Sequence, residues 1–226
     1  MRDHIFSLEV ISYTILWVVW CCSHSILAAN FMKRLFERFA RVYRLAFNGF
    51  ALVTFFMMVL YERSLPRVMI YQFEGLTNIV RVAVFVAGVA IFIITAFHYN
   101  LLHFAGISQL FKKVDIKAAN FENRFVITGP LRVVRHPWYS AAHLVIWTGS
   151  KELYITTLTA NLVFSIYLII GSVLEERKLV EQYGESYRHY QKQVSMLVPV
   201  RWIKTLLLKK EKTEDDAWKE NITRKD

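Results

Sequence analysis

Residues 79 to 97 read IVRVAVFVAGVAIFIITAF, and Arg81 is the single charged residue in this stretch. The hydrocarbon core of a bilayer is about 30 Å thick and needs roughly 20 apolar helical residues to cross it. The stretch therefore predicts a transmembrane helix. Because Arg81 lies near its start, we expect this long side chain to reach the lipid headgroups.

Other apolar segments on both sides extend this pattern into a polytopic membrane protein. Leu8–Ala29 and Leu45–Tyr61 each predict one span. The longer region Trp138–Leu174 is interrupted by the polar residues 149–152 and predicts a helical hairpin. Its arms are Trp138–Thr148, which is too short for a full crossing, and Leu153–Leu174.

The fold class that follows is all-α, with about five transmembrane helices, a C-terminal hairpin and an amphipathic helix. We expect residues 1–226 to form a single membrane domain. Its parts are a three-span half (1–100), a core (126–200) and a charged tail (203–226) that is solvated and partly helical.

Composition agrees with this fold class. Of the 226 residues 55% are hydrophobic, the net charge is +10 and the mean hydropathy is +0.31, which exclude a disordered chain and a collagen-like fibre. The only cysteines, Cys21 and Cys22, are adjacent in an apolar run, which argues against a disulfide scaffold. Because the charge lies in connections between spans, it requires no nucleic-acid partner.

The basic connections predict the orientation of the chain in the lipid bilayer. Residues 31–44 contain five Lys and Arg against one Glu, whereas residues 62–78 contain two of each sign. Since cytoplasmic connections are enriched in Lys and Arg, we expect the N-terminus outside and the C-terminus inside. The host membrane and the oligomeric state stay open.

Ionisable and polar residues collect at the predicted cytoplasmic ends of the spans. Such residues are costly at this depth unless they face a protein interior or a wet cavity, so a shared site is the first hypothesis. Taken singly, each also fits an interfacial anchor or a topology signal. The residues are His24, Arg44, Asn48, His98, His143, Glu175 and Glu176.

The densest group of polar residues lies in residues 129–139, GPLRVVRHPWY. Pro137 suits the first turn of a helix, because its missing N–H is not needed there. The positive end of that helix would be flanked by Arg132, Arg135 and His136, which predicts a site for a carboxylate or a phosphate. Tyr139 would lie on the same helix face as His143.

A second group begins at Glu175-Glu176 and ends at Val198-Pro199. Read as one helix, it aligns Glu176 with Tyr183, Tyr187 and Tyr190. A carboxylate accepts hydrogen bonds from ribose hydroxyls, and aromatic rings suit adenine or a sulfonium cation. An amphipathic helix on the membrane surface would explain the tyrosines but not the paired glutamates.

Together these motifs resemble the integral-membrane methyltransferases of the isoprenylcysteine carboxyl methyltransferase and phospholipid methyltransferase superfamily. The similarity implies S-adenosylmethionine as cofactor and no metal. It implies that the following residues bind the cofactor: Arg135, His136, Pro137, Tyr139, Glu175, Glu176 and Tyr187. In the first half, His24-Ser25, Tyr43-Arg44-Leu45 and Asn48 are similar to the nurim-like and methanethiol S-methyltransferase branch.

The expected function is methyl transfer to a small thiol such as methanethiol, or to another lipophilic acceptor. We expect His24, Arg44 and His98 to be catalytic and Asn48 and His143 to contact the substrate. Isoprenylcysteine carboxyl O-methylation and phospholipid N-methylation are alternatives. A haem-binding or nicotinamide-dependent membrane redox protein and a non-catalytic nurim-like protein are further ones.

Overall fold

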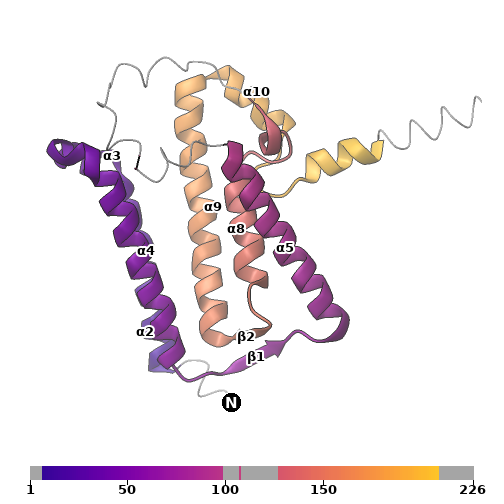
Figure 1. Cartoon of the computed structure of the whole chain (residues 1–226). Helices are drawn as coiled ribbons and strands as arrows, with labels where there is room; N and C mark the ends of the chain where they lie inside the picture. Colours follow the sequence, from indigo (N-terminus) through magenta and orange to yellow (C-terminus); the bar gives the residue numbers. More distant parts are fainter. Residues whose placement is uncertain (1–6, 99–106, 108–126, 209–226) are drawn as a thin grey trace, which may run out of the picture.

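The computed structural model of the chain describes residues 7–98, 107 and 127–208. Four long helices run along one another in these segments (Figure 1): α2 (Leu8–Ala28), α4 (Ala40–Ser64), α5 (Gly75–His98) and α9 (Ile155–Tyr183). Each lies in a helical segment long and apolar enough to cross a membrane. The prediction of an all-α membrane protein is confirmed.

A fifth helix, α8 (Pro137–Thr148), has 12 residues and is therefore about 18 Å long, as predicted for the short arm. Its last carbonyl group has no partner within the helix. Arg81 Nη1 donates to this Thr148 carbonyl at 2.6 Å, and Arg81 Nε donates to Asn78 Oδ1 at 2.9 Å. The guanidinium group of Arg81 therefore completes the end of α8, a partner that the sequence did not predict.

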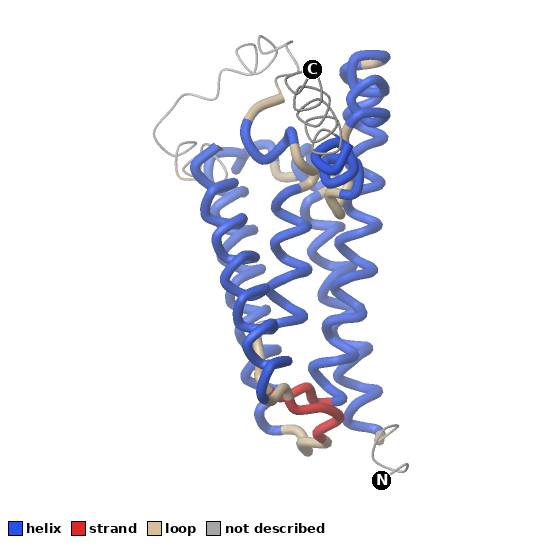
Figure 2. The backbone as a smooth tube through the Cα atoms, turned by 90° about the vertical axis from the view of Figure 1, so that its right-hand side faces the viewer, coloured by secondary structure: helices blue, strands red, loops and turns tan. Residues whose placement is uncertain are grey.

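Two short strands join the connections at one end of the bundle (Figure 2). β1 (Met69–Gln72) and β2 (Glu152–Tyr154) pair in antiparallel orientation, with Tyr71 opposite Leu153. Neither strand was predicted: residues 149–152 have the composition of a turn between the hairpin arms, and residues 69–72 lie in the connection between two predicted spans. The pairing links the α4–α5 connection to the α8–α9 connection.

Helix α5 packs closely on α8 because both have small residues where they cross. A Cβ atom placed on Gly88 would lie 2.9 Å from Leu144 Cβ and 3.4 Å from the Ala141 carbonyl oxygen. One turn along α5, the rings of Phe92 and Trp138 meet edge to face, with centroids 4.4 Å apart. Small residues allow membrane helices to approach in this way.

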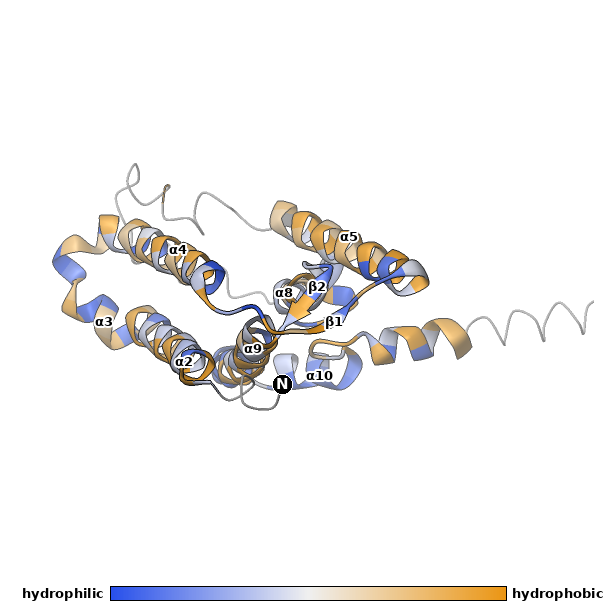
Figure 3. Ribbon diagram, turned by 90° about the horizontal axis from the view of Figure 1, so that it is seen from below, coloured by the Kyte–Doolittle hydropathy of each residue, from blue (hydrophilic) through white to orange (hydrophobic). Residues whose placement is uncertain are grey.

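Helix α9 lies between α2 and α8 (Figure 3). Toward α8, Asn161 Nδ2 donates to the Ile146 carbonyl and Ser165 Oγ accepts from Trp147 Nε1, both at 2.9 Å. Toward α2, the Phe164 ring lies 4.7 Å from the Trp17 ring. Neighbouring faces of α9 therefore contact α8 and α2.

The C-terminal helices depart from the predicted pattern. α9 continues through Glu175 and Glu176 to Tyr183, and α10 (Glu185–Gln193) begins after Gly184, whose φ of +57° suits glycine. The single helix predicted from Glu176 to Tyr190 is therefore wrong. Shorter helices are α3 (Asn30–Leu35), η1 (Glu37–Phe39) and η3 (Gly129–Arg132), and residues 200–208 are also helical.

Candidate functional site

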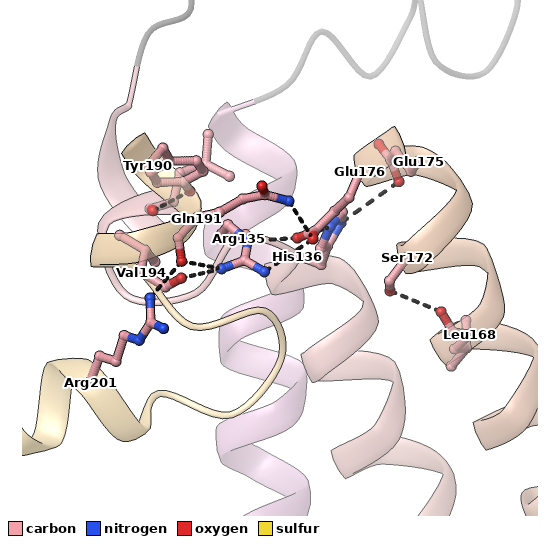
Figure 4. A network of polar contacts seen from close by, with 11 residues as sticks. Arg135, His136, Leu168, Ser172, Glu175, Glu176, Tyr190, Gln191, Val194 and Arg201 are labelled. Atoms are coloured by element: carbon pink, nitrogen blue, oxygen red, sulfur yellow. Dashed lines mark hydrogen bonds and ion pairs between the residues drawn. The ribbon is translucent and has the colours of Figure 1, made fainter. Parts of the chain in front are cut away.

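The site is centred on an ion pair between residues that are distant in the sequence (Figure 4). Arg135 precedes α8, and Glu176 lies in the last part of α9. Arg135 Nε donates to Glu176 Oε1 at 2.5 Å and Arg135 Nη2 donates to Oε2 at 3.1 Å, which is the two-pronged geometry that guanidinium and carboxylate groups favour. The side chains are only 10% and 12% exposed.

The segment after α10 completes the surroundings of Arg135. Arg135 Nη1 donates to the carbonyl groups of Gln191, at 3.0 Å, and Val194. Gln191 Nε2 in turn donates to Glu176 Oε2 at 2.9 Å. The guanidinium group therefore joins the start of α8, the end of α9 and the end of α10.

Backbone pairing aligns the segment before α8 with residues 194–197. The amide of Arg135 donates to the Ser195 carbonyl at 2.9 Å, and the amide of His136 donates to the Met196 carbonyl at 3.0 Å. Ser140 Oγ donates to the Leu197 carbonyl at 2.6 Å. These bonds fix the direction from which Arg135 and His136 enter the site.

His136 lies between the two glutamates. Its buried ring donates from Nε2 to Glu176 Oε1 at 3.3 Å, and its Nδ1 lies 3.7 Å from Glu175 Oε2. The ring stacks on Tyr139, with centroids 5.5 Å apart and an interplanar angle of 13°. Glu175, unlike Glu176, is 49% exposed. The site therefore has one buried carboxylate and one accessible carboxylate.

Tyr187 and Tyr190 hold α10 against this group. Both are buried, and Tyr190 Oη donates to the Leu131 carbonyl at 2.6 Å. Burial, followed by the negative charge of Glu176, raises the pKa of Tyr187 well above the usual tyrosine value. Tyr187 is consequently a neutral phenol at physiological pH.

The structure places His24 apart from this group. His24 Nδ1 lies 2.8 Å from Tyr167 Oη, and its ring stacks on Trp20 and lies 4.9 Å from the Phe47 ring. Tyr167 and Glu176 are nine residues apart on α9, which is about two and a half turns, so they lie on opposite faces and about 13 Å apart along the axis. His24 thus contacts the α2-facing side of α9.

The remaining predicted residues lie on three helices. Arg44 and Asn48 are on α4. Burial, followed by the charges of Arg44 and Lys178, lowers the pKa of Lys33. Lys33 is therefore within electrostatic range of Arg44 on α4 and of Lys178 on α9. His143 Nδ1 donates to the Tyr139 carbonyl at 2.7 Å. His98 is the last residue of α5, and its side chain lies outside the described residues.

Several partners could not be identified from the sequence. Arg135 donates to the backbone carbonyl groups of Gln191 and Val194. A sequence pattern of side chains does not reveal which backbone carbonyl group accepts a hydrogen bond. Gln191 itself carries no motif signal. Tyr167 could have been suggested only by its position in an apolar span, where a hydroxyl group needs a partner.

Known proteins similar to this chain have one name in common. A methanethiol S-methyltransferase of Pseudomonas deceptionensis is 44% identical over 68 residues, 30% of this chain and 26% of that protein. Methanethiol S-methyltransferase 1 of Bradyrhizobium diazoefficiens is 27% identical over 194 residues, 85% of this chain and 67% of the relative. A methanethiol S-methyltransferase of Crocosphaera subtropica is 27% identical over 187 residues, 80% of this chain and 71% of that protein.

The match therefore spans about a quarter of the first of these relatives and about two thirds or more of the other two. No protein-family model and no solved structure matches the chain. This chain is therefore similar to methanethiol S-methyltransferases over most of its length, and the resemblance predicted from its motifs is confirmed.

Proposed function

We propose that this chain is a membrane methyltransferase that uses S-adenosylmethionine and methylates a small thiol such as methanethiol. The observation that carries the proposal is the meeting of Arg135, His136, Glu175 and Glu176 at one end of the bundle. These are the residues in which the sequence resembles membrane methyltransferases. The names of the relatives support the reaction and the acceptor.

The charged groups of the site suit the polar ends of this cofactor, which supplies a methyl group bound to a sulfonium sulfur. His136 and the positive end of the α8 dipole would hold a carboxylate. Glu175 would accept from the ribose hydroxyls, because it is 49% exposed. Within the part of the chain that the structure describes, His136 is its one ionic partner, at 3.7 Å. Tyr139, stacked on His136, would offer an aromatic surface.

Arg135 and Glu176 have a different role in this proposal. Three nitrogen atoms of Arg135 already donate to protein acceptors, and both oxygens of Glu176 accept from protein donors. We assign them to positioning His136 and α10. Tyr187 is 1% exposed, so we assign it to packing of α10 and not to the wall of the cofactor site.

On the acceptor side, the nucleophile is a thiolate, which nearby positive charge favours. Lys33, Arg44 and Lys178 supply such charge at this end of the bundle. His143 lies one helical turn after Tyr139 and donates from Nδ1 to its carbonyl group. In the neutral form of His143, Nε2 is therefore free to accept a proton. We propose that His143 Nε2 would accept the proton of the thiol, and that the cofactor would supply the methyl group to the resulting thiolate. Roles for His24, Asn48 and His98 stay predictions.

The orientation in the membrane belongs to the same proposal. Helix α3, with Lys33 and Arg34, lies at the end of the bundle that carries α10 (Figure 1). Because cytoplasmic connections are enriched in Lys and Arg, this end and the site would face the cytoplasm. The N-terminus would be outside and the C-terminus inside.

Calorimetric titration of the purified full chain with S-adenosylhomocysteine tests the cofactor assignment. Hydrogen bonds to charged groups contribute about 1.5–3 kcal/mol, so Glu175→Gln and His136→Ala should each weaken binding by about tenfold or more. Glu181→Gln is the matched control, because Glu181 is exposed on the same helix. Unchanged affinity in both site variants would overturn the assignment.

A further inference from the structure

The helix of residues 200–208, VRWIKTLLL, follows Pro199 and extends away from the bundle (Figures 1 and 3). In Figure 1 it starts near the level at which α5 ends and runs across the direction of α9. The sequence predicted a charged, solvated tail from residue 203. That tail was expected to be partly helical, and residues 203–208, IKTLLL, are helical; residues 209–226 lie outside the described residues.

The helix is amphipathic. At 3.6 residues per turn, five apolar side chains occupy one broad face, and Arg201, Lys204 and Thr205 occupy the other, together with Leu208. The five apolar side chains are between 43% and 60% exposed. They are Val200, Trp202, Ile203, Leu206 and Leu207. An apolar face of this kind in contact with water would be unfavourable.

The polar face is the one attached to the protein. Arg201 Nη1 donates to the Gln191 carbonyl at 2.5 Å, and the Arg201 amide donates to Ser195 Oγ at 3.2 Å. The centre of the apolar face is about half a turn around the helix from Arg201. The apolar side chains therefore point away from the α10 segment.

We propose that residues 200–208 form an interfacial helix whose apolar face is buried at the boundary between headgroups and acyl chains of the membrane that the bundle spans. Helix α5 is long and apolar enough to span that membrane, and the helix of residues 200–208 leaves the bundle near the level at which α5 ends (Figure 1). On the opposite face, Arg201 attaches the helix to the Gln191 carbonyl, and Lys204 is the cation that would meet lipid phosphates. The partner is the lipid bilayer itself.

This placement connects the bilayer to the site. The Gln191 carbonyl accepts from both Arg201 and Arg135, and Ser195 accepts from the amides of both residues, at Oγ and at its carbonyl. A membrane-bound helix would therefore fix the depth of residues 191–197, which pair with the start of α8. The proposal does not depend on which reaction the site performs.

Spin labels on the full chain in phospholipid nanodiscs test the proposal. With Cys21 and Cys22 replaced by alanine, a single cysteine is introduced in turn at positions 202 to 207 and labelled. Labels at Ile203→Cys, Leu206→Cys and Leu207→Cys should be accessible to oxygen, which concentrates in lipid, and shielded from a water-soluble nickel chelate. Lys204→Cys and Thr205→Cys should show the reverse.

Nickel accessibility at all of these positions would show a solvated tail and overturn the proposal. Shielding of the apolar positions from both reagents would show a protein partner instead, and would also overturn it. As a second measurement, Leu206→Ser/Leu207→Ser should accelerate amide exchange of residues 191–197 about tenfold, because loss of apolar burial weakens the anchor. Thr205→Ser, on the polar face, is the control and should leave exchange unchanged.

Discussion

Glu175 and Glu176 are adjacent, and replacing each by glutamine should have different effects. Glu176 accepts from Arg135 at 2.5 and 3.1 Å, from Gln191 at 2.9 Å and from His136 at 3.3 Å. Removing one partner of a buried ion pair costs about 3–5 kcal/mol. Because glutamine keeps one acceptor oxygen, we expect the lower end for Glu176→Gln, about 3 kcal/mol, which corresponds to a decrease in Tm of about 6–12 °C.

Glu175→Gln should lower the stability by less than about 1 kcal/mol, since exposed ion pairs contribute little and this one spans 3.7 Å to a 49% exposed carboxylate. The assay is the thermal unfolding of both full-length variants in one detergent, followed by S-adenosylhomocysteine titration below the lower Tm. We expect Glu176→Gln to lose stability and Glu175→Gln to lose affinity. Equal losses of stability in the two variants would refute the division of roles between the glutamates.

Three other predictions test the packing of α5 on α8 and the surroundings of two basic side chains, Arg81 and Lys33. Gly88→Leu should destabilise the fold by at least about 1–3 kcal/mol, measured by thermal unfolding, because a Cβ there would lie 2.9 Å from Leu144 Cβ; Gly49→Leu is the control, since its Cβ would have no neighbour within 4 Å. Arg81→Met should lower the free energy of unfolding by about 1–3 kcal/mol, because it leaves the Thr148 carbonyl without its donor. A Tm equal to that of wild type would contradict the role of Arg81 at the end of α8. Burial, Arg44 and Lys178 lower the pKa of Lys33 in the folded protein. The unfolded chain therefore binds more protons between that lowered value and 10.5, and stability rises with pH in that window. Lys33→Gln should be more stable than wild type at neutral pH, with a difference in Tm that shrinks as the pH approaches 10.5; a constant difference would refute the lowered pKa of Lys33 as its cause.

The long apolar spans could be predicted because crossing a bilayer requires a length and a composition that a sequence displays directly. Leu8–Ala29 was predicted within one residue of α2. The end of α9 was predicted nine residues early, because hydropathy stops at Leu174 while the helix continues through charged residues to Tyr183. Hydropathy locates the apolar part of a helix, and caps such as Gly184 determine where it ends.

The candidate site was predicted in its composition but not in its pairing. The motifs at residues 135–139 and 175–176 indicated that charged groups would meet, and they do. Which glutamate is buried depends on how α9 is rotated against α8, and that rotation is set by contacts such as Asn161 with the Ile146 carbonyl. The backbone carbonyl groups that accept hydrogen bonds from Arg135 and Arg81 cannot be identified from any side-chain pattern.

The most direct test of the proposed methyltransferase activity is the transfer of a labelled methyl group to methanethiol. The purified full chain in nanodiscs is incubated with S-adenosylmethionine labelled in its methyl group and with methanethiol, and labelled dimethyl sulfide is measured in the headspace. The proposed function predicts labelled product from wild type and from Glu181→Gln, and at least about tenfold less from Glu175→Gln at limiting cofactor. Equal product from Glu175→Gln, or no labelled product from a folded wild-type protein, would contradict it.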